Sequence, residues 1–174
     1  MSYKALNNIQ AINDSLETPS STREFQLGSP IPINDTTKGQ ESVFIYCKAH
    51  TGLSLGQPVN LIEGTGGNAE VITSSFVAVT SGQGELIGYP ITAVTSGYYF
   101  WAQISGVITA AASPGIAVGD HVQCIASGTT IIVDGTTGAT TRNATSCGIA
   151  KTATSGGTAT IVVMPGLRSQ IAAT

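Results

Sequence analysis

The side chains that could carry out chemistry in this chain are two histidines and three cysteines, namely His50, His121, Cys47, Cys124 and Cys147. Cysteine catalysis requires a thiolate beside a positioned imidazole. Cys47 and His50 are separated by the same spacing as His121 and Cys124, and on a strand this spacing places two side chains on opposite faces. We therefore predict no catalytic residue and expect that the protein is not an enzyme. A hydrolase is the enzymatic alternative, and it lacks a nucleophile–base pair.

Metal and cofactor sites find equally little support in the sequence. A structural zinc site needs four ligands in a recognisable spacing, which these scattered cysteines and histidines do not supply. Residues 63–70, EGTGGNAE, are no phosphate loop, because they lack the Lys–Ser/Thr ending and open no helix. We predict no metal ligand and no cofactor. The odd number of cysteines in apolar segments favours buried free thiols.

An internal repeat occupies the middle of the chain. Residues 52–62, GLSLGQPVNLI, match residues 115–125, GIAVGDHVQCI, in their glycines and their apolar positions. A weaker match relates residues 88–106 to residues 148–166. The repeated residues are turn glycines and alternating apolar positions, so the repeat indicates duplicated β architecture.

Asp120 and Gln57 occupy equivalent positions in the two copies of the repeat. An aspartate in G-D-x-V is typical of a turn that leads into a strand, because its carboxylate accepts hydrogen bonds from nearby backbone amides. The following position is His121 in one copy and Pro58 in the other, so the scaffold does not require a histidine there. This turn therefore needs no catalytic explanation.

The composition excludes several classes of function. Charged residues make up 10% of the chain, compared with roughly 25% in an ordinary soluble protein, and the net charge is −3. No basic run is present, so we expect no nucleic-acid partner. No apolar stretch reaches the ~18 residues of a membrane span, and the polar N-terminus is not a signal peptide. An uncharged surface suits a protein covered by other subunits; a Thr/Ser-rich secreted β-protein is the alternative.

The N-terminal residues 1–35 differ from the rest and are predicted to form an arm. A short amphipathic helix is expected over residues 5–16, followed by a strand-like segment at residues 23–28. Residues 29–35, SPIPIND, are predicted to be an extended polyproline-like connector. A helix packed on its own domain is the alternative. The apolar stripe of the helix comprises Leu6, Ile9, Ile12 and Leu16.

Residues 36–167 are predicted to form the body of the protein, and residues 168–174 a C-terminal tail. Short strand-like segments alternate with Gly-, Ser- and Thr-rich turns at intervals of about ten residues. No convincing helical periodicity occurs outside the arm. We therefore predict an all-β fold, an antiparallel β-barrel or sandwich with an internally duplicated turn–strand unit and an extended N-terminal arm.

The largest local concentration of aromatic side chains is YYFW at residues 98–101. On a strand, Tyr98 and Phe100 face one side, whereas Tyr99 and Trp101 face the other. One pair is expected in the core and the other at an interface or a sugar-stacking surface. Packing of both faces into the core is the alternative.

The duplicated G-h-x-h-G-[DQ]-x-V-x-x-I unit (h, apolar), the low charge and the N-terminal arm together resemble the capsid decoration (cement) proteins of tailed bacteriophages. The resemblance covers roughly residues 25–166 and is one of pattern and composition. It implies a small β-barrel-like homotrimer on the exterior of the virion, synthesised in the host cytoplasm. Such a protein has no active site and stabilises the head by bridging neighbouring capsomers of the major capsid protein.

We expect the arm and the aromatic strand to supply the capsid or subunit contacts. An arm that becomes ordered on binding adds contact area at an entropic cost. The expected contact residues are Leu6, Ile9, Ile12, Leu16, Phe25, Leu27, Tyr99 and Trp101. The alternative function is a carbohydrate-binding or fibre-type adhesion module that uses the strand from Tyr98 to Trp101 as an exposed platform.

Overall fold

The computed structural model describes residues 16–35, 40–62, 71–73, 86–124, 129–133 and 146–163. These residues contain ten strands and no complete helix, although Leu16, where the description begins, is helical. None of the described segments is a helix that could cross a membrane. The strands are β1 (Pro30–Asp35), β2 (Gln40–Lys48), β3 (Val59–Ile62), β4 (Val71–Thr73), β5 (Leu86–Pro90), β6 (Tyr99–Ala111), β7 (His121–Cys124), β8 (Ile131–Val133), β9 (Ser146–Ala150) and β10 (Thr158–Val163).

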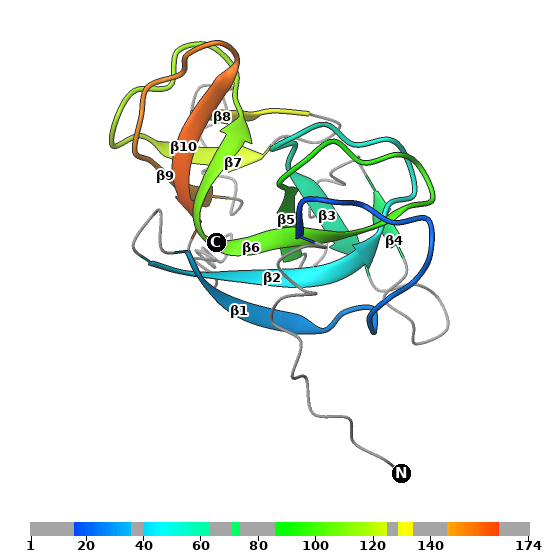
Figure 1. Cartoon of the computed structure of the whole chain (residues 1–174). Helices are drawn as coiled ribbons and strands as arrows, with labels where there is room; N and C mark the ends of the chain where they lie inside the picture. Colours follow the sequence, from blue (N-terminus) through cyan, green and yellow to red (C-terminus); the bar gives the residue numbers. More distant parts are fainter. Residues whose placement is uncertain are drawn as a thin grey trace, which may run out of the picture.

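The strands form one sheet in which all the pairings are antiparallel (Figure 1). Eight of them follow the order β4-β3-β5-β6-β10-β9-β7-β8, and the hairpin β1–β2 joins through the pairing of β2 with β6. The all-β prediction is confirmed. Within the described strands this order does not close on itself, so the architecture is open and sandwich-like rather than a barrel.

The sheet order is palindromic, and the palindrome follows the sequence repeat. β3, β4, β5 and β6 of the first copy correspond in order to β7, β8, β9 and β10 of the second copy. The two copies meet where β6 pairs with β10, for example at Ile108 and Ile161. An antiparallel central pair flanked by matching strands is the arrangement that a twofold relation between two copies produces. The repeat therefore describes two halves of one sheet.

β6 connects the two halves because it changes partners along its length. Its first half pairs with β2 as far as Ser105, and its second half pairs with β10 from Gly106 onward. Gly106 has a φ of 99°, and a Cβ there would lie 2.6 Å from the Ser42 Oγ atom. The buried Gln103 amide donates to Ser42 Oγ at 3.0 Å and to the Ser105 carbonyl at 2.9 Å. Gly106 and the buried side-chain amide of Gln103 thus stabilise the point at which β6 changes its partner from β2 to β10.

The N-terminal segment is structured differently from the prediction at one point. Residues 30–35, predicted as a polyproline-like connector, form β1 and pair with β2 from Pro30 to Asp35. Proline is tolerated on an edge strand, where a missing N–H does not interrupt a ladder. Ile31 and Ile33 are half-buried and pack on the aromatic cluster described below, which favours the strand over a free connector.

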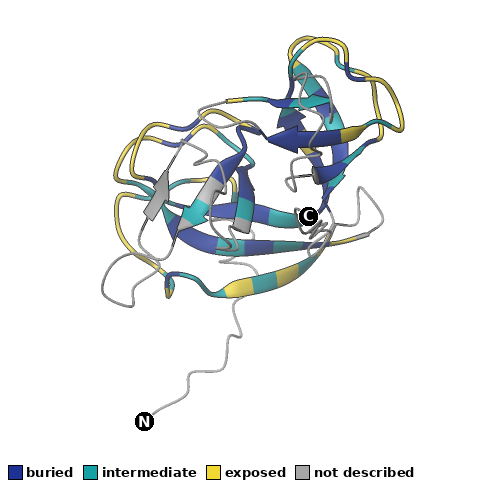
Figure 2. Ribbon diagram, turned by 180° about the vertical axis from the view of Figure 1, so that it is seen from behind, coloured by how far each residue is buried: buried dark blue, intermediate teal, exposed yellow. Residues whose placement is uncertain are grey.

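The hydrophobic core is divided along the same lines as the sheet. One cluster lies between β5–β6 and β7–β10, a second lies between β2, β3 and β6, and a third lies under the N-terminal segment. Figure 2 shows that β6 is buried along most of its length, whereas the loops beyond its ends are exposed. Buried strands therefore fix the scaffold, and loops form much of the described surface.

Candidate binding surface

Three segments that are distant in the sequence meet in an aromatic cluster on β2 and β6. The Trp101 ring centroid lies 4.9 Å from that of Tyr46 and 5.2 Å from that of Phe25. Tyr46 also stacks with Tyr99 at 6.1 Å, and Lys48 Nζ lies 5.4 Å from the Tyr99 ring centroid. Such aromatic pairs contribute about 0.5–1.5 kcal/mol each beyond the area they bury. The cluster joins the N-terminal segment to the sheet.

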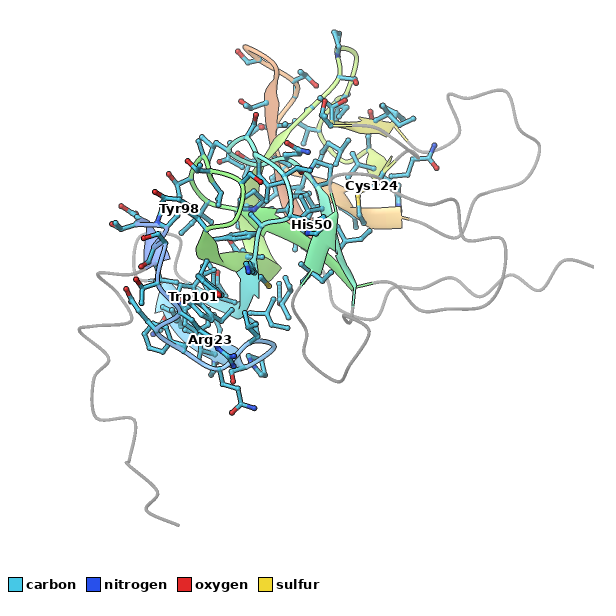
Figure 3. The ribbon with its side chains drawn as sticks, turned by 90° about the vertical axis from the view of Figure 1, so that its right-hand side faces the viewer. Arg23, His50, Tyr98, Trp101 and Cys124 are labelled. Carbon is cyan, nitrogen blue, oxygen red and sulfur yellow. The ribbon has the colours of Figure 1, made fainter. Side chains whose placement is uncertain are left out.

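Backbone hydrogen bonds attach the same N-terminal segment, residues 16–29. Ser20 and Tyr99 exchange N–H···O bonds of 3.0 and 2.8 Å, and Gly28 N–H donates to the Tyr46 carbonyl at 2.8 Å. The Glu24 amide donates to the Tyr46 hydroxyl at 3.2 Å, and burial raises the pKa of that hydroxyl. In Figure 3, Trp101 lies beside the segment that carries Arg23. Residues 16–29 therefore lie against the body of the protein.

The cluster brings together five of the residues predicted to contact a capsid or another subunit. Trp101 is 1% exposed and Leu27 8% exposed, while the other three are half-buried. Their contacts are within the chain, because the aromatic face of β2 and β6 is covered by the chain's own N-terminal segment. The assignment of these residues to partner contacts stays a prediction, and Trp101 and Leu27 have little exposed surface to offer a partner. The five residues are Leu16, Phe25, Leu27, Tyr99 and Trp101.

The remaining predicted contact residues, Leu6, Ile9 and Ile12, lie outside the described residues. Of the other aromatic residues in YYFW, Phe100 is buried in the second core cluster and Tyr98 packs against it. Both faces of the aromatic strand are therefore occupied. Trp101 does not form the exposed platform that a glycan would stack on.

The two repeated turns have the same hydrogen bonds. In the first copy, Gln57 N–H donates to the Ser54 carbonyl at 3.2 Å, and the Gln57 Oε1 atom accepts from Ser54 N–H at 3.1 Å. In the second copy, Asp120 N–H donates to the Ala117 carbonyl at 3.2 Å, and its Oδ2 atom accepts from Ala117 N–H at 2.8 Å. The structural role predicted for Asp120 is confirmed, and Gln57 performs the same role.

The repeated glycines anchor these turns to the sheet. Gly56 N–H donates to the Pro90 carbonyl and Gly119 N–H to the Ala150 carbonyl, each at 2.8 Å. Both glycines have positive φ, 67° and 88°. A left-handed conformation is costly for a residue with a Cβ. Each copy thus presents one rigid turn at the end of its sheet.

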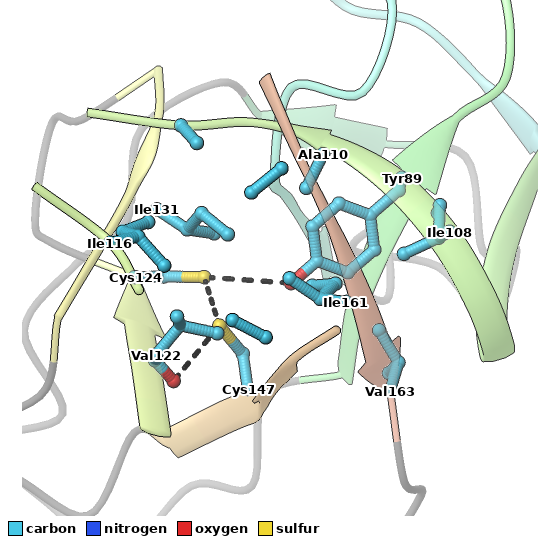
Figure 4. Close-up of a cluster of buried hydrophobic side chains, with 13 residues drawn as sticks. Tyr89, Ile108, Ala110, Ile116, Val122, Cys124, Ile131, Cys147, Ile161 and Val163 are labelled. Carbon is cyan, nitrogen blue, oxygen red and sulfur yellow. Dashed lines mark hydrogen bonds between the residues drawn. The ribbon is translucent and has the colours of Figure 1, made fainter. Parts of the chain in front are cut away.

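The groups with potential reactivity lie in the core. Cys124 Sγ is 3.2 Å from Cys147 Sγ and 3.9 Å from the Tyr89 hydroxyl, and all three residues are buried (Figure 4). The hydrogen bond to Cys147 and burial raise the pKa of the Cys124 thiol, and burial raises that of Cys47. A thiolate, not a thiol, is the nucleophile.

The prediction of buried free thiols is confirmed. Sequence analysis did not anticipate Tyr89, because a single tyrosine in a strand carries no recognisable signal.

The histidines are not placed beside these thiols. His50 and His121 are exposed, whereas Cys47 and Cys124 are buried. Within the part of the chain that the structure describes, no group of three or more His, Cys, Asp or Glu residues could hold a metal ion.

Cys47 and Cys124 are expected to react with a thiol reagent only after unfolding. Their raised pKa in the folded state keeps them protonated near pH 8, while an unfolded cysteine ionises at about 8.5. The protonated folded state is therefore stable below about pH 8.5, and stability should fall as the pH rises further, because the unfolded chain then loses protons that the folded chain retains. Titration with an aromatic disulfide in native buffer measures the reactivity of the thiols. Urea unfolding midpoints at neutral and alkaline pH measure the change in stability. If all three thiols reacted rapidly with the reagent in native buffer, the buried position of the cysteines would be contradicted.

Comparison with known proteins gives a limited result. No protein-family model matches the sequence, and no curated protein matches it. A similar solved structure is described as the crystal structure of the head fiber gp8.5 N base in bacteriophage phi29. It is 17% identical in sequence, the alignment covers 71% of this chain and 94% of that chain, and the TM-score is 0.48.

Proposed function

We propose that this chain is a structural protein of a phage virion that binds the outer surface of the head, and that it is not an enzyme. The proposal begins from the resemblance of residues 25–166 to capsid decoration proteins. The observation that carries it is the duplicated sheet, in which each half presents the same rigid turn. A scaffold that repeats its own surface is suited to a partner that is itself repeated, as a head lattice is.

The distribution of side chains supports a binding role. Cys47, Cys124 and Tyr89 pack into the core, where their pKa values are raised, so these groups contribute to stability rather than to nucleophilic chemistry. The first repeated turn, residues 53–57, carries no charged residue, and the second, residues 116–120, carries only Asp120, whose carboxylate accepts a hydrogen bond from Ala117 N–H. An uncharged contact loses little hydration when it is covered by another subunit.

The protein would stabilise the phage head by bridging neighbouring capsomers. A protein that touches neighbouring capsomers at the same time gains affinity, since each further contact is intramolecular and has a high effective concentration. We propose a homotrimer on the virion exterior as the bridging species, with the major capsid protein as its partner. The mass of the protein in solution tests the trimer.

The capsid contact proposed for the N-terminal arm involves fewer residues than the sequence alone suggested. Phe25, Leu27 and Trp101 pack within the chain, so the capsid contact of the arm falls to the apolar stripe Leu6, Ile9 and Ile12. An arm that becomes ordered on the head would add contact area at an entropic cost.

Deleting residues 1–15 is expected to leave a folded oligomer that no longer saturates phage heads. All the described contacts of the aromatic cluster remain in this variant, because they begin at Leu16. Co-sedimentation with heads that lack the protein, from the phage whose genome carries the gene, measures the binding. The matched control is the full-length chain with Leu6, Ile9 and Ile12 replaced by serine, which should behave like the deletion. Normal saturation by both variants would refute the role of the arm.

A further inference from the structure

The two exposed large hydrophobic side chains of the described residues occupy equivalent positions of the repeat. Leu55 is 51% exposed and Val118 is 69% exposed. Leu55 is the second apolar residue of GLSLG, and Val118 is the second apolar residue of GIAVG. A single exposed apolar residue needs no explanation. The same exposure at the same position of both copies indicates a shared purpose.

The local geometry shows how the exposure is maintained. The first apolar residue of each unit, Leu53 or Ile116, is buried at 5% or 3% exposure and anchors the turn in the core. Leu53 also exchanges backbone hydrogen bonds of 2.8 and 2.9 Å with Val94, and the Ile116 carbonyl accepts from Thr154 N–H at 3.0 Å. The chain then turns outward, so the second apolar residue faces solvent.

Each exposed side chain is held in a fixed position. The turn that carries Leu55 is closed by the Gln57 side chain, and the turn that carries Val118 is closed by the Asp120 carboxylate. These bonds order the turn before any partner arrives, which removes an entropic cost from binding. The closing residues differ in chemistry between the copies, while the exposed apolar residue occurs in both.

The two side chains are close enough to engage one extended partner. The Gly56 carbonyl, next to Leu55, accepts from Ala111 N–H at 2.9 Å. The stretch from Ala111 to Val118 spans at most about 25 Å even when fully extended. With the hydrogen bond and the step from Gly56 to Leu55 added, the Cα atoms of Leu55 and Val118 lie within roughly 35 Å of each other.

We propose that Leu55 and Val118 are twin contact points that insert into two copies of one small apolar pocket on a repeating protein surface. This inference rests on the proposed function, which supplies that surface in the form of the phage head. Two equivalent contacts on one rigid body require two equivalent pockets, and a protein lattice provides them at a fixed spacing. Both contact side chains are uncharged, and the one charge in the two turns, Asp120, is engaged by the Ala117 amide, so binding through Leu55 and Val118 should depend little on salt.

The test measures head binding of Leu55→Ser, Val118→Ser and the double variant beside the wild type. Each single variant should lose about 100-fold or more in affinity, because it loses the intramolecular second contact. The double variant, which keeps neither contact, should also lose the binding that a single contact retains. The matched control carries Thr95→Ala and Ser155→Ala, exposed residues at equivalent positions of the second turn in each copy, and it should bind like the wild type.

Each result has a defined meaning. Both substitutions are at exposed sites, so unchanged melting curves will establish that the variants are folded. If the wild type binds heads and the single variants bind equally well, the twin contacts are refuted while the proposed function stands. A loss in only one single variant refutes their equivalence. If the wild type itself fails to bind heads, the proposed function is refuted and the twin contacts with it.

Discussion

Replacing Trp101 with alanine is expected to lower the free energy of unfolding by about 3–5 kcal/mol. The indole is 1% exposed and lies against the rings of Phe25 and Tyr46, so its removal leaves a cavity between β2, β6 and the N-terminal segment. The N-terminal segment cannot move freely into this cavity, because Ser20 and Gly28 are hydrogen-bonded to the sheet. Incomplete collapse places the expected cost toward the upper part of that range.

Equilibrium urea unfolding of Trp101→Ala measures this loss, with tyrosine fluorescence or circular dichroism as the signal. The control is Leu55→Ala, an apolar truncation at an exposed site, which should change stability by less than about 0.5 kcal/mol. A double-mutant cycle with Phe25→Ala should show a coupling of about 0.5–1.5 kcal/mol, since the two rings are in contact. A stable Trp101→Ala protein that had lost glycan binding would restore the adhesion-module hypothesis.

Replacing Gly148 with alanine is expected to destabilise the second half of the sheet by about 1–3 kcal/mol or more. Gly148 lies in β9, and a Cβ there would be 2.5 Å from the Val162 carbonyl oxygen of β10. The obstructing atom is backbone in a paired strand, so relief requires β9 and β10 to move apart. At the equivalent Gly88, the added Cβ would lie 2.9 Å from the Ala102 Cβ atom and 3.1 Å from a Leu61 methyl group, so the overlap is smaller and the cost should be smaller.

Thermal unfolding of Gly148→Ala and Gly88→Ala, compared with Gly52→Ala, tests this ranking. Gly52 is a suitable control because an added Cβ would meet only the Val94 carbonyl at 3.9 Å, an ordinary contact distance. Alanine there should be neutral, or stabilising through reduced freedom of the unfolded chain. A Gly148→Ala protein that melts like the Gly52→Ala control would show that β9 and β10 are not packed as closely as described.

Local features of this protein could be predicted from the sequence because they depend on neighbouring residues. The turns at Gly56 and Gly119, the backbone bond made by Asp120 and the strand that begins within YYFW follow from turn chemistry and from alternation over a few positions. The internal repeat could be read in the same way. It correctly indicated architecture rather than a catalytic site at Asp120 and His121.

Tertiary structure decided which of these local elements meet. No pattern in PIPIND distinguishes a connector from a strand, because the choice depends on the free edge of β2. The side of β6 on which Trp101 is covered depends on where residues 16–29 return, and the contact of Cys124 with Cys147 depends on the register of β7 and β9.

The duplicated β units, the buried character of the thiols and the rigid turns all follow from the order of the amino acids alone. The palindromic sheet that the two units form through β6 and β10 depends on long-range packing. So does the exposure of Leu55 and Val118, which alone among the large hydrophobic residues described are mostly exposed. These two groups of features differ because propensity and turn chemistry act over a few residues, whereas burial is set by every strand that packs against a position.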